Sequence, residues 1–176
     1  MSATQLHRVE VTPKSFAGLV DTRGESVRRR LAGDQGIHIE NVRSIVGYLV
    51  KADLKPTQAD RMVNDLFCDP VIEHGSANNP MLDDTTLFPV TPDIVIQVGF
   101  KPGVTDNAAQ AGLDGFKTLF PEEGKSASVA TTMTYAFYGV PEGIEGSWLA
   151  SQLHNPMIER AAIAERDACN SAQWPT

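Results

Sequence analysis

Residues 36–54 read GIHIENVRSIVGYLVKADL, and the order of their side chains decides the expected fold class. Apolar and small polar residues alternate along this stretch, which predicts an extended strand with one face on a core. Residues 126–140, SASVATTMTYAFYGV, show the same alternation, and Tyr48 and Tyr135 occupy corresponding positions 87 residues apart. Because Gly47 would permit a bend, each stretch is predicted to be either one long bent strand or a hairpin.

The elements on either side of these two stretches follow the same order. A short alternating strand, HRVEV at 7–11 or DIVIQV at 93–98, comes first in each half of the chain. A helix follows it, and its start is predicted after Asp21 or Asp106, whose carboxylates can accept the free N–H groups of a first helical turn. The second helix of each half stops at an Asp-Pro or Asn-Pro pair, since the residue before proline leaves the helical region. A short terminal strand is expected at VIE, residues 71–73, and at MIE, residues 157–159.

The sequence therefore predicts a chain that is built twice. The expected fold is α+β, with two tandem ferredoxin-like β-α-β-β-α-β repeats that form an intramolecular pseudo-dimer with antiparallel sheets and carry their helices on one face. The expected boundaries are a first repeat at 6–76, a Pro-rich linker at 77–93, a second repeat at 94–165 and a tail at 166–176.

The charged residues are distributed unevenly over the 176 residues. The net charge is −7, and all of it lies in residues 77–176, because residues 1–76 hold ten basic and ten acidic side chains. This balance argues against nucleic acid as a partner, since phosphate binding needs a basic face. The exception is Arg28-Arg29-Arg30 on the first predicted helix, which is either a solvated helical face or a patch for docking or for phosphate contact.

Residues that carry chemistry are scarce. Cys68 and Cys169 form no CxxC pair, and the four histidines have no metal-ligand spacing. We find no Gly-rich phosphate loop and no nucleophile elbow, so no catalytic, cofactor-binding or metal-binding residue is predicted. The apolar runs are too short to cross a bilayer and no signal peptide is recognisable, which together predict a cytoplasmic protein without a membrane partner.

Several stretches together resemble one known family. They are VDTRGESVRRRLAGDQGIHIENVR at 20–43, CDPVIE at 68–73, KPGVTDNAAQAG at 101–112 and NPMIER at 155–160. Their order is similar to that of the small structural subunit of phosphoribosylformylglycinamidine synthase, the PurS family. The family's Lys-Pro-Gly turn is matched by Lys101, Pro102 and Gly103, whereas the corresponding turn of the first half, TPKSFAGLVD, is longer and altered. Members of the family are usually single units, so the doubled chain also departs from it.

The resemblance implies a non-catalytic role in purine biosynthesis. The full enzyme is an ATP- and glutamine-dependent ligase that converts formylglycinamide ribonucleotide to the amidine. The small subunit joins the large synthetase subunit, or domain, to the glutaminase subunit and supports ammonia transfer, and a homo-oligomer is possible. Two alternatives stay open at this point: a tandem ferredoxin-like regulatory module that binds a small-molecule effector, and an enzyme with a site at the junction of the two halves.

Overall fold

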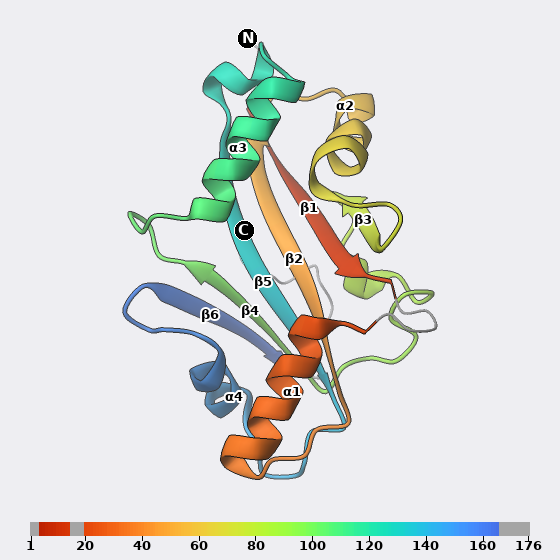
Figure 1. Ribbon diagram of the computed structural model, residues 1–176, viewed down its shortest axis with the longest axis vertical. Helices are drawn as coiled ribbons and strands as arrows, with labels where there is room; N and C mark the ends of the chain where they lie inside the picture. Colours follow the sequence, from red (N-terminus) through yellow and green to blue (C-terminus); the bar gives the residue numbers. More distant parts are fainter. Residues whose placement is uncertain (1–3, 15–19, 166–176) are drawn as a thin grey trace.

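A computed structural model describes residues 4–14 and 20–165 of the chain, so the expected tail at 166–176 lies outside the described residues (Figure 1). The fold is α+β, as predicted. The described residues form six strands, β1 (Gln5–Pro13), β2 (Asn41–Ala52), β3 (Glu73–Ala77), β4 (Ile94–Phe100), β5 (Ser128–Tyr138) and β6 (Glu159–Glu165). The same part of the chain forms four α-helices, α1 (Thr22–Gln35), α2 (Pro56–Met62), α3 (Asn107–Leu119) and α4 (Gly146–Leu153).

The six strands form a single antiparallel sheet in the order β3-β1-β2-β5-β4-β6. Its centre is the pair β2–β5, which runs from Asn41 opposite Tyr138 to Lys51 opposite Ser128. The prediction left open whether each of these stretches is one strand or a hairpin, and the structure has one continuous strand in both cases. The β-α-β-β-α-β pattern was therefore wrong by one strand in each half. A hairpin is excluded because β2 pairs with β5 without interruption from Asn41 to Lys51 and with β1 from Val46 to Ala52.

Gly47 has a different purpose from the predicted bend. It lies in the middle of β2 opposite Thr132 of β5, and a Cβ built on it would come within 2.2 Å of the Thr132 hydroxyl oxygen. Because glycine has no side chain, the Thr132 side chain of β5 fits beside the β2 backbone at this point.

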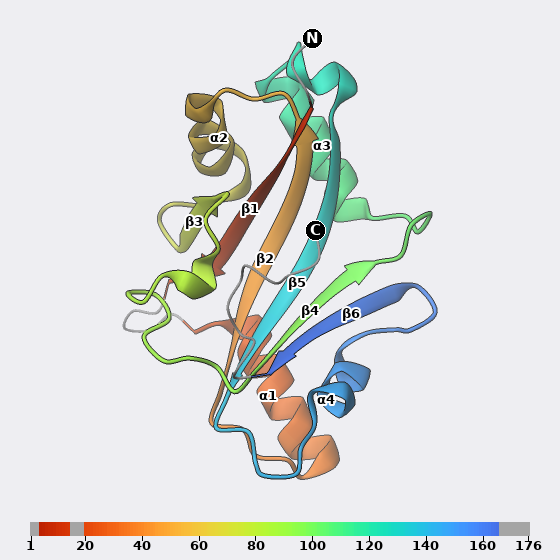
Figure 2. The same ribbon diagram turned by 180° about the vertical axis from the view of Figure 1, so that it is seen from behind.

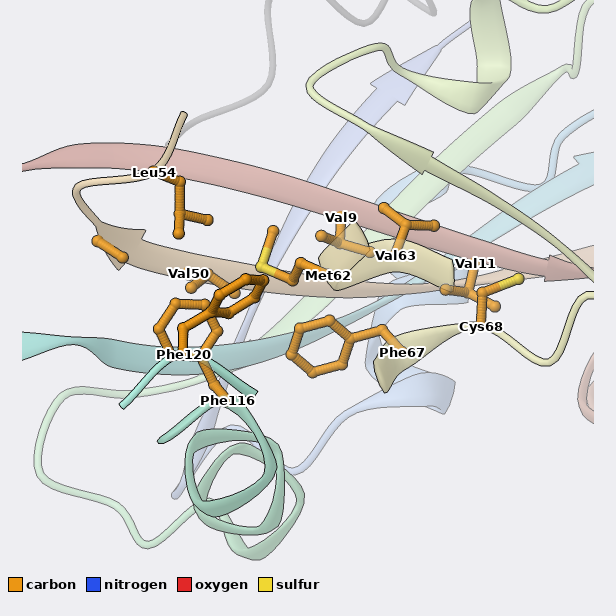
Figure 3. Close-up of a cluster of buried hydrophobic side chains, with 11 residues drawn as sticks. Val9, Val11, Val50, Leu54, Met62, Val63, Phe67, Cys68, Phe116 and Phe120 are labelled. Carbon is orange, nitrogen blue, oxygen red and sulfur yellow. The ribbon is translucent and has the colours of Figure 1, made fainter. Parts of the chain in front are cut away.

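Helices α1 and α3 lie across one face of the sheet, in front of the strands in Figure 1 and behind them in Figure 2. Each of these helices completes a core that belongs mainly to the other half of the chain. Figure 3 shows Phe116 of α3 and Phe120, the residue that follows α3, packed against Val50 of β2 and Met62 of α2. Conversely, Val27 and Leu31 of α1 pack with strand and helix residues of the second half, namely Ile94, Ile96, Val98, Phe137, Leu149 and Ala150. The halves therefore share their cores.

The opposite face of the sheet is covered in part by the segment that joins β3 to β4, which is seen in front of the strands in Figure 2. Met81 and Phe88 of this segment are buried against Ile45 of β2. The guanidinium of Arg43 lies 4.1 Å from the centroid of the Phe88 ring. The predicted linker therefore contributes a small core of its own.

Two further expectations were partly wrong. The sequences VIE and MIE were expected to be strands, but Val71-Ile72 and Met157-Ile158 lie in turns, and the strands begin only at Glu73 and Glu159. The apolar residues of these turns point outward, with Val71 72% and Met157 81% exposed. Among the described helices, none combines the length and the apolar character that a membrane crossing requires.

The shared core gives a first prediction. Replacing Phe116, which is 0% exposed, with alanine should lower the free energy of unfolding by about 3–5 kcal/mol, because a large cavity opens between α3 and the first half. Urea denaturation measures the change. Val90, 62% exposed, is the control, and Val90→Ala should change the free energy by less than about 0.5 kcal/mol. A loss below about 1 kcal/mol for Phe116→Ala would show that α3 does not close this core.

Candidate functional site

The Lys-Pro-Gly turn, which carries the family resemblance, lies in a corner where β4 ends. The Lys101 backbone N–H donates to the Ile158 carbonyl at 2.9 Å, and its Nζ donates to the Pro156 carbonyl at 2.5 Å. Gly103 has φ +86°, a left-handed value that glycine adopts at little cost, and Val104 N–H closes the turn onto the Lys101 carbonyl at 3.1 Å. Lys101 therefore connects the end of β4 to the loop after α4.

The loop after α4 is held by its own polar groups. The Asn155 carbonyl accepts from the N–H groups of Ile158 and Glu159 at 3.1 and 2.8 Å. Its Oδ1 accepts from the Met157 N–H at 3.0 Å, and the Glu159 carboxylate accepts from the Asn155 N–H at 2.7 Å. The Asn-Pro stop and the following glutamate, read in the sequence only as the end of a helix, thus build one closed turn.

The first half has the same corner, which the sequence did not reveal. Lys14 N–H donates to the Ile72 carbonyl at 2.9 Å, and Lys14 Nζ donates to the Pro70 carbonyl. The Glu73 carboxylate accepts from the Asp69 N–H at 2.9 Å, as Glu159 does from Asn155. Lys14 was missed because it precedes Asp21 by seven residues, whereas Lys101 precedes Asp106 by only five. The signal that could have found it is the D/N-P-x-I-E sequence common to both corners.

The two predicted helix-capping aspartates are confirmed, and each also holds a central strand. Asp106 accepts from Ala109 N–H at 2.8 Å, and from the N–H and hydroxyl of Thr131 in β5 at 2.9 and 2.7 Å. Asp21 accepts from Gly24 N–H at 2.9 Å, and from the N–H and hydroxyl of Ser44 in β2 at 2.5 and 2.8 Å. Each carboxylate is therefore occupied in tying the start of a helix to the sheet.

A cleft of about 420 Å³ lies beside the Lys101 corner. Gly99 and Gly103 form part of its lining, and its polar lining includes Gln97, Lys101 and Arg160. Lys101 is already bonded to the Pro156 carbonyl, and the lining contains no serine, cysteine or histidine. The cleft can therefore receive a polar group, while its Asp106 and Thr131 side chains are bonded to each other.

The three arginines of the predicted patch do not act as a unit. Arg28 Nε and Arg29 Nε each donate to the Glu25 carboxylate at 2.7 Å. Arg30 donates instead to the Gln152 carbonyl of α4 at 2.7 Å. Hydrogen bonds from Arg28 and Arg29 lower the pKa of the Glu25 carboxyl to about 2. Two of the three charges are thus partly balanced within α1, and docking by this patch stays a prediction.

The paired carboxylates serve local structure. Asp84 Oδ1 accepts from the N–H and hydroxyl of Thr86 at 2.8 and 2.6 Å, which lowers the pKa of this carboxyl. Glu122 pairs with Lys125 at 2.5 Å, and Glu123 accepts from the Gln58 amide at 2.7 Å. Within residues 4–14 and 20–165, no group of three or more histidine, cysteine, aspartate or glutamate side chains could hold a metal ion.

Comparison of the chain with protein-family models, curated proteins and solved structures gives no match. Any functional proposal therefore depends on the residues and contacts of the chain itself.

The aspartate caps give a second prediction. Asp106→Ala removes the acceptor for three donors and should lower the free energy of unfolding by about 2 kcal/mol, while Asp106→Asn, which keeps one oxygen, should lose less. Chemical denaturation measures both. Asp114→Ala in the same helix is the matched control and should be close to neutral, because Asp114 is exposed and alanine favours helix. Equal losses at positions 106 and 114 would contradict the proposed role of the cap.

Glu25 gives a third prediction. Because its pKa is lowered in the folded state, its stabilising contribution is complete above the ordinary range near 4.5 and is lost as the pH falls toward 2. NMR titration of the Glu25 carboxyl carbon should give a midpoint near 2. Arg29→Gln should raise that midpoint, whereas Arg61→Gln, which removes a distant pair with Asp65, should leave it in place. A midpoint near 4.5 in the unmodified chain would exclude the double pairing.

Proposed function

We propose that the chain is a tandem duplication in which two ferredoxin-like units pair as an intramolecular pseudo-dimer. The strand registers support this proposal. Val9 lies opposite Tyr48 in the first half, and Ile96 lies opposite Tyr135 in the second, so both members of the pair are displaced by 87 residues. At the centre of the sheet Val46 lies opposite Met133, its own counterpart at the same displacement. A two-fold axis through this pair would relate β1-β2 to β4-β5.

The recurring hydrogen bonds support the same proposal. A lysine after the first strand bonds to the proline carbonyl of the closing turn, an aspartate joins the first helix to the central strand, and a glutamate accepts from the first N–H of the turn. These contacts involve Lys14, Asp21 and Glu73 in one half and Lys101, Asp106 and Glu159 in the other. Bonds of this kind, repeated at matched positions, are difficult to explain by chance similarity of two unrelated units.

We infer that this duplicated unit is a non-catalytic bridging component of phosphoribosylformylglycinamidine synthase that acts in the cytoplasm. The observation that carries the inference is the use of the signature residues: Lys101, Gly103, Asp106, Asn155 and Glu159 are all engaged in holding a corner of the fold. The charged side chains of Lys101, Asp106 and Glu159 bond to backbone groups of the chain itself, whereas in an enzyme such side chains often contact the substrate. The resemblance and the geometry thus favour the same class of function, a scaffold.

The surface offers two similar places for partners. The turns that precede the edge strands β3 and β6 each carry a pair of exposed apolar residues. Val71 is 72% and Ile72 45% exposed in the first turn, and Met157 is 81% and Ile158 41% exposed in the second. Because β3 and β6 are the opposite edges of the sheet, these pairs lie at separate sites. Exposed apolar side chains often mark protein contacts. Two such sites on one rigid sheet suit a bridge between a synthetase and a glutaminase subunit.

Reconstitution tests this function and is the fourth prediction. Adding the chain to the large subunit and the glutaminase should raise glutamine-dependent amidine synthesis several-fold and change synthesis from free ammonia far less. The double variant Val71→Glu, Met157→Glu should remove most of this gain without lowering the thermal midpoint, while Val90→Glu, also on an exposed residue, should keep it.

Two results would contradict the bridging role. One is glutaminase or ATPase activity of the isolated chain that survives removal of contaminants. The other is an equal gain in synthesis from glutamine and from ammonia, because a bridge that supports ammonia transfer has no effect on ammonia supplied from solution.

A further inference from the structure

The two helix pairs on the covered face of the sheet are closed in different ways. In the pair formed by α3 and the π-helical turn Val63–Phe67, two glycines of α3 allow close approach. A Cβ on Gly115 would come within 2.5 Å of Leu66, and one on Gly112 within 3.1 Å of Phe67. The Phe67 ring then stacks on Tyr48 with centroids 4.2 Å apart. This side of the molecule is filled by packed rings.

The other pair, α1 and α4, lies side by side in Figures 1 and 2, and its buried side is filled by aliphatic side chains, among them Val27, Leu31 and Leu149. Counted from the capping aspartates, Arg30 of α1 takes the place that Gly115 has in α3. Arg30 donates to the Gln152 carbonyl of α4. Counted back from the Asp-Pro and Asn-Pro pairs, Leu153 takes the place that Phe67 has in the first half. A groove of about 400 Å³ remains between the two helices, with Tyr135, the counterpart of Tyr48, in its lining.

The polar lining of this groove consists of hydrogen-bond donors, and Val27 and Leu153 add an apolar part. Arg23, Ser26 and Arg30 occupy one stripe of α1, and Thr22 and the Tyr135 hydroxyl add two further donors. Arg23 makes no hydrogen bond or ion pair with the part of the chain that the structure describes. The positive end of the α1 dipole points to the same side, since Thr22 and Arg23 form its first turn.

The charges around Tyr135 are net positive. Burial raises the pKa of its phenol, so the hydroxyl keeps its proton at neutral pH. Arg23 and Arg30 oppose that rise more strongly than the carboxylates of Asp21 and Glu159 support it. Asp21 is moreover bonded to the N–H groups of Gly24 and Ser44. In a chain with a net charge of −7, this groove is a local exception.

We propose that the groove between α1 and α4 binds the phosphate group of a small phosphorylated molecule. Two guanidinium groups and three hydroxyls offer more donors than the two oxygens of a carboxylate can use, whereas a phosphate monoester presents three oxygens and nearly two negative charges. Arginine's planar fork matches such oxygens two at a time. The groove is open to solvent, since Arg23, Ser26 and Arg30 are all exposed, so it leaves room for a sugar attached to the phosphate. This site is independent of the bridging role, because it uses none of the corner residues.

NMR titration with inorganic phosphate and with ribose 5-phosphate, at constant ionic strength, tests the proposal and is the fifth prediction. The amide signals of residues 22–30 should shift and saturate. Arg23→Gln should weaken binding about tenfold and Tyr135→Phe a few-fold, as expected for losing a charge-assisted and a neutral hydrogen bond. Arg29→Gln removes an equal charge that faces Glu25 outside the groove, and it should change the affinity less than twofold.

The outcomes separate clearly. Saturable binding of either probe at residues 22–30 supports the proposal, and a tighter fit of ribose 5-phosphate would add that the sugar is recognised. Shifts that do not saturate, or an Arg29→Gln variant that weakens binding as much as Arg23→Gln, would overturn it in favour of general charge attraction. Arg23→Lys, which keeps the positive charge, should bind more tightly than Arg23→Gln. That difference would show that the charge at position 23, and not a disturbance of the fold by any substitution there, controls the affinity.

Discussion

The fold depends first on the pairing of β2 with β5. Hydrogen bonds run along the two strands from Asn41 opposite Tyr138 to Lys51 opposite Ser128, and they convert two three-stranded sheets into one. The pairing also brings the first helix of each half over the core of the other. Phe116 of α3 therefore closes a core built from β1, β2 and α2, and Leu31 of α1 closes one built from β4, β5 and α4. Units of about 75 residues bury a limited fraction of their surface, so sharing cores supplies the burial that either half lacks.

Polar side chains that could have served chemistry are used to fix this arrangement. The Asp21 and Asp106 carboxylates each accept from both a helix and a central strand, and Lys14 and Lys101 each donate to the carbonyl of a proline. A carboxylate or ammonium group held in this way stabilises the fold because its partners are already in place. A chain whose distinctive residues are all engaged in its own corners is suited to present rigid surfaces, and its two exposed apolar turns lie at opposite edges of the sheet.

The two halves have similar frameworks and differ in the side chains that fill them. Beneath α3 the space is occupied by the stacked rings of Phe67 and Tyr48, whereas between α1 and α4 it is lined by Arg23, Arg30 and Tyr135. Gly112 and Gly115 of α3 permit close approach of a neighbouring turn, whereas Arg30 of α1 donates to a backbone carbonyl of α4.

The sequence by itself determined what is local. Alternation predicted the strands, the positions of Asp21 and Asp106 predicted the helix starts, and the Asp-Pro and Asn-Pro pairs predicted the helix ends, because each of these signals acts over a few residues. The tertiary structure decided what depends on partners far along the chain. Alternation is the same in a hairpin and in a long strand, so only pairing on both sides made β2 and β5 continuous. The bond of Lys14 to Pro70, the crossing of α1 and α3, and the groove left by Arg30 likewise join residues that no local pattern connects.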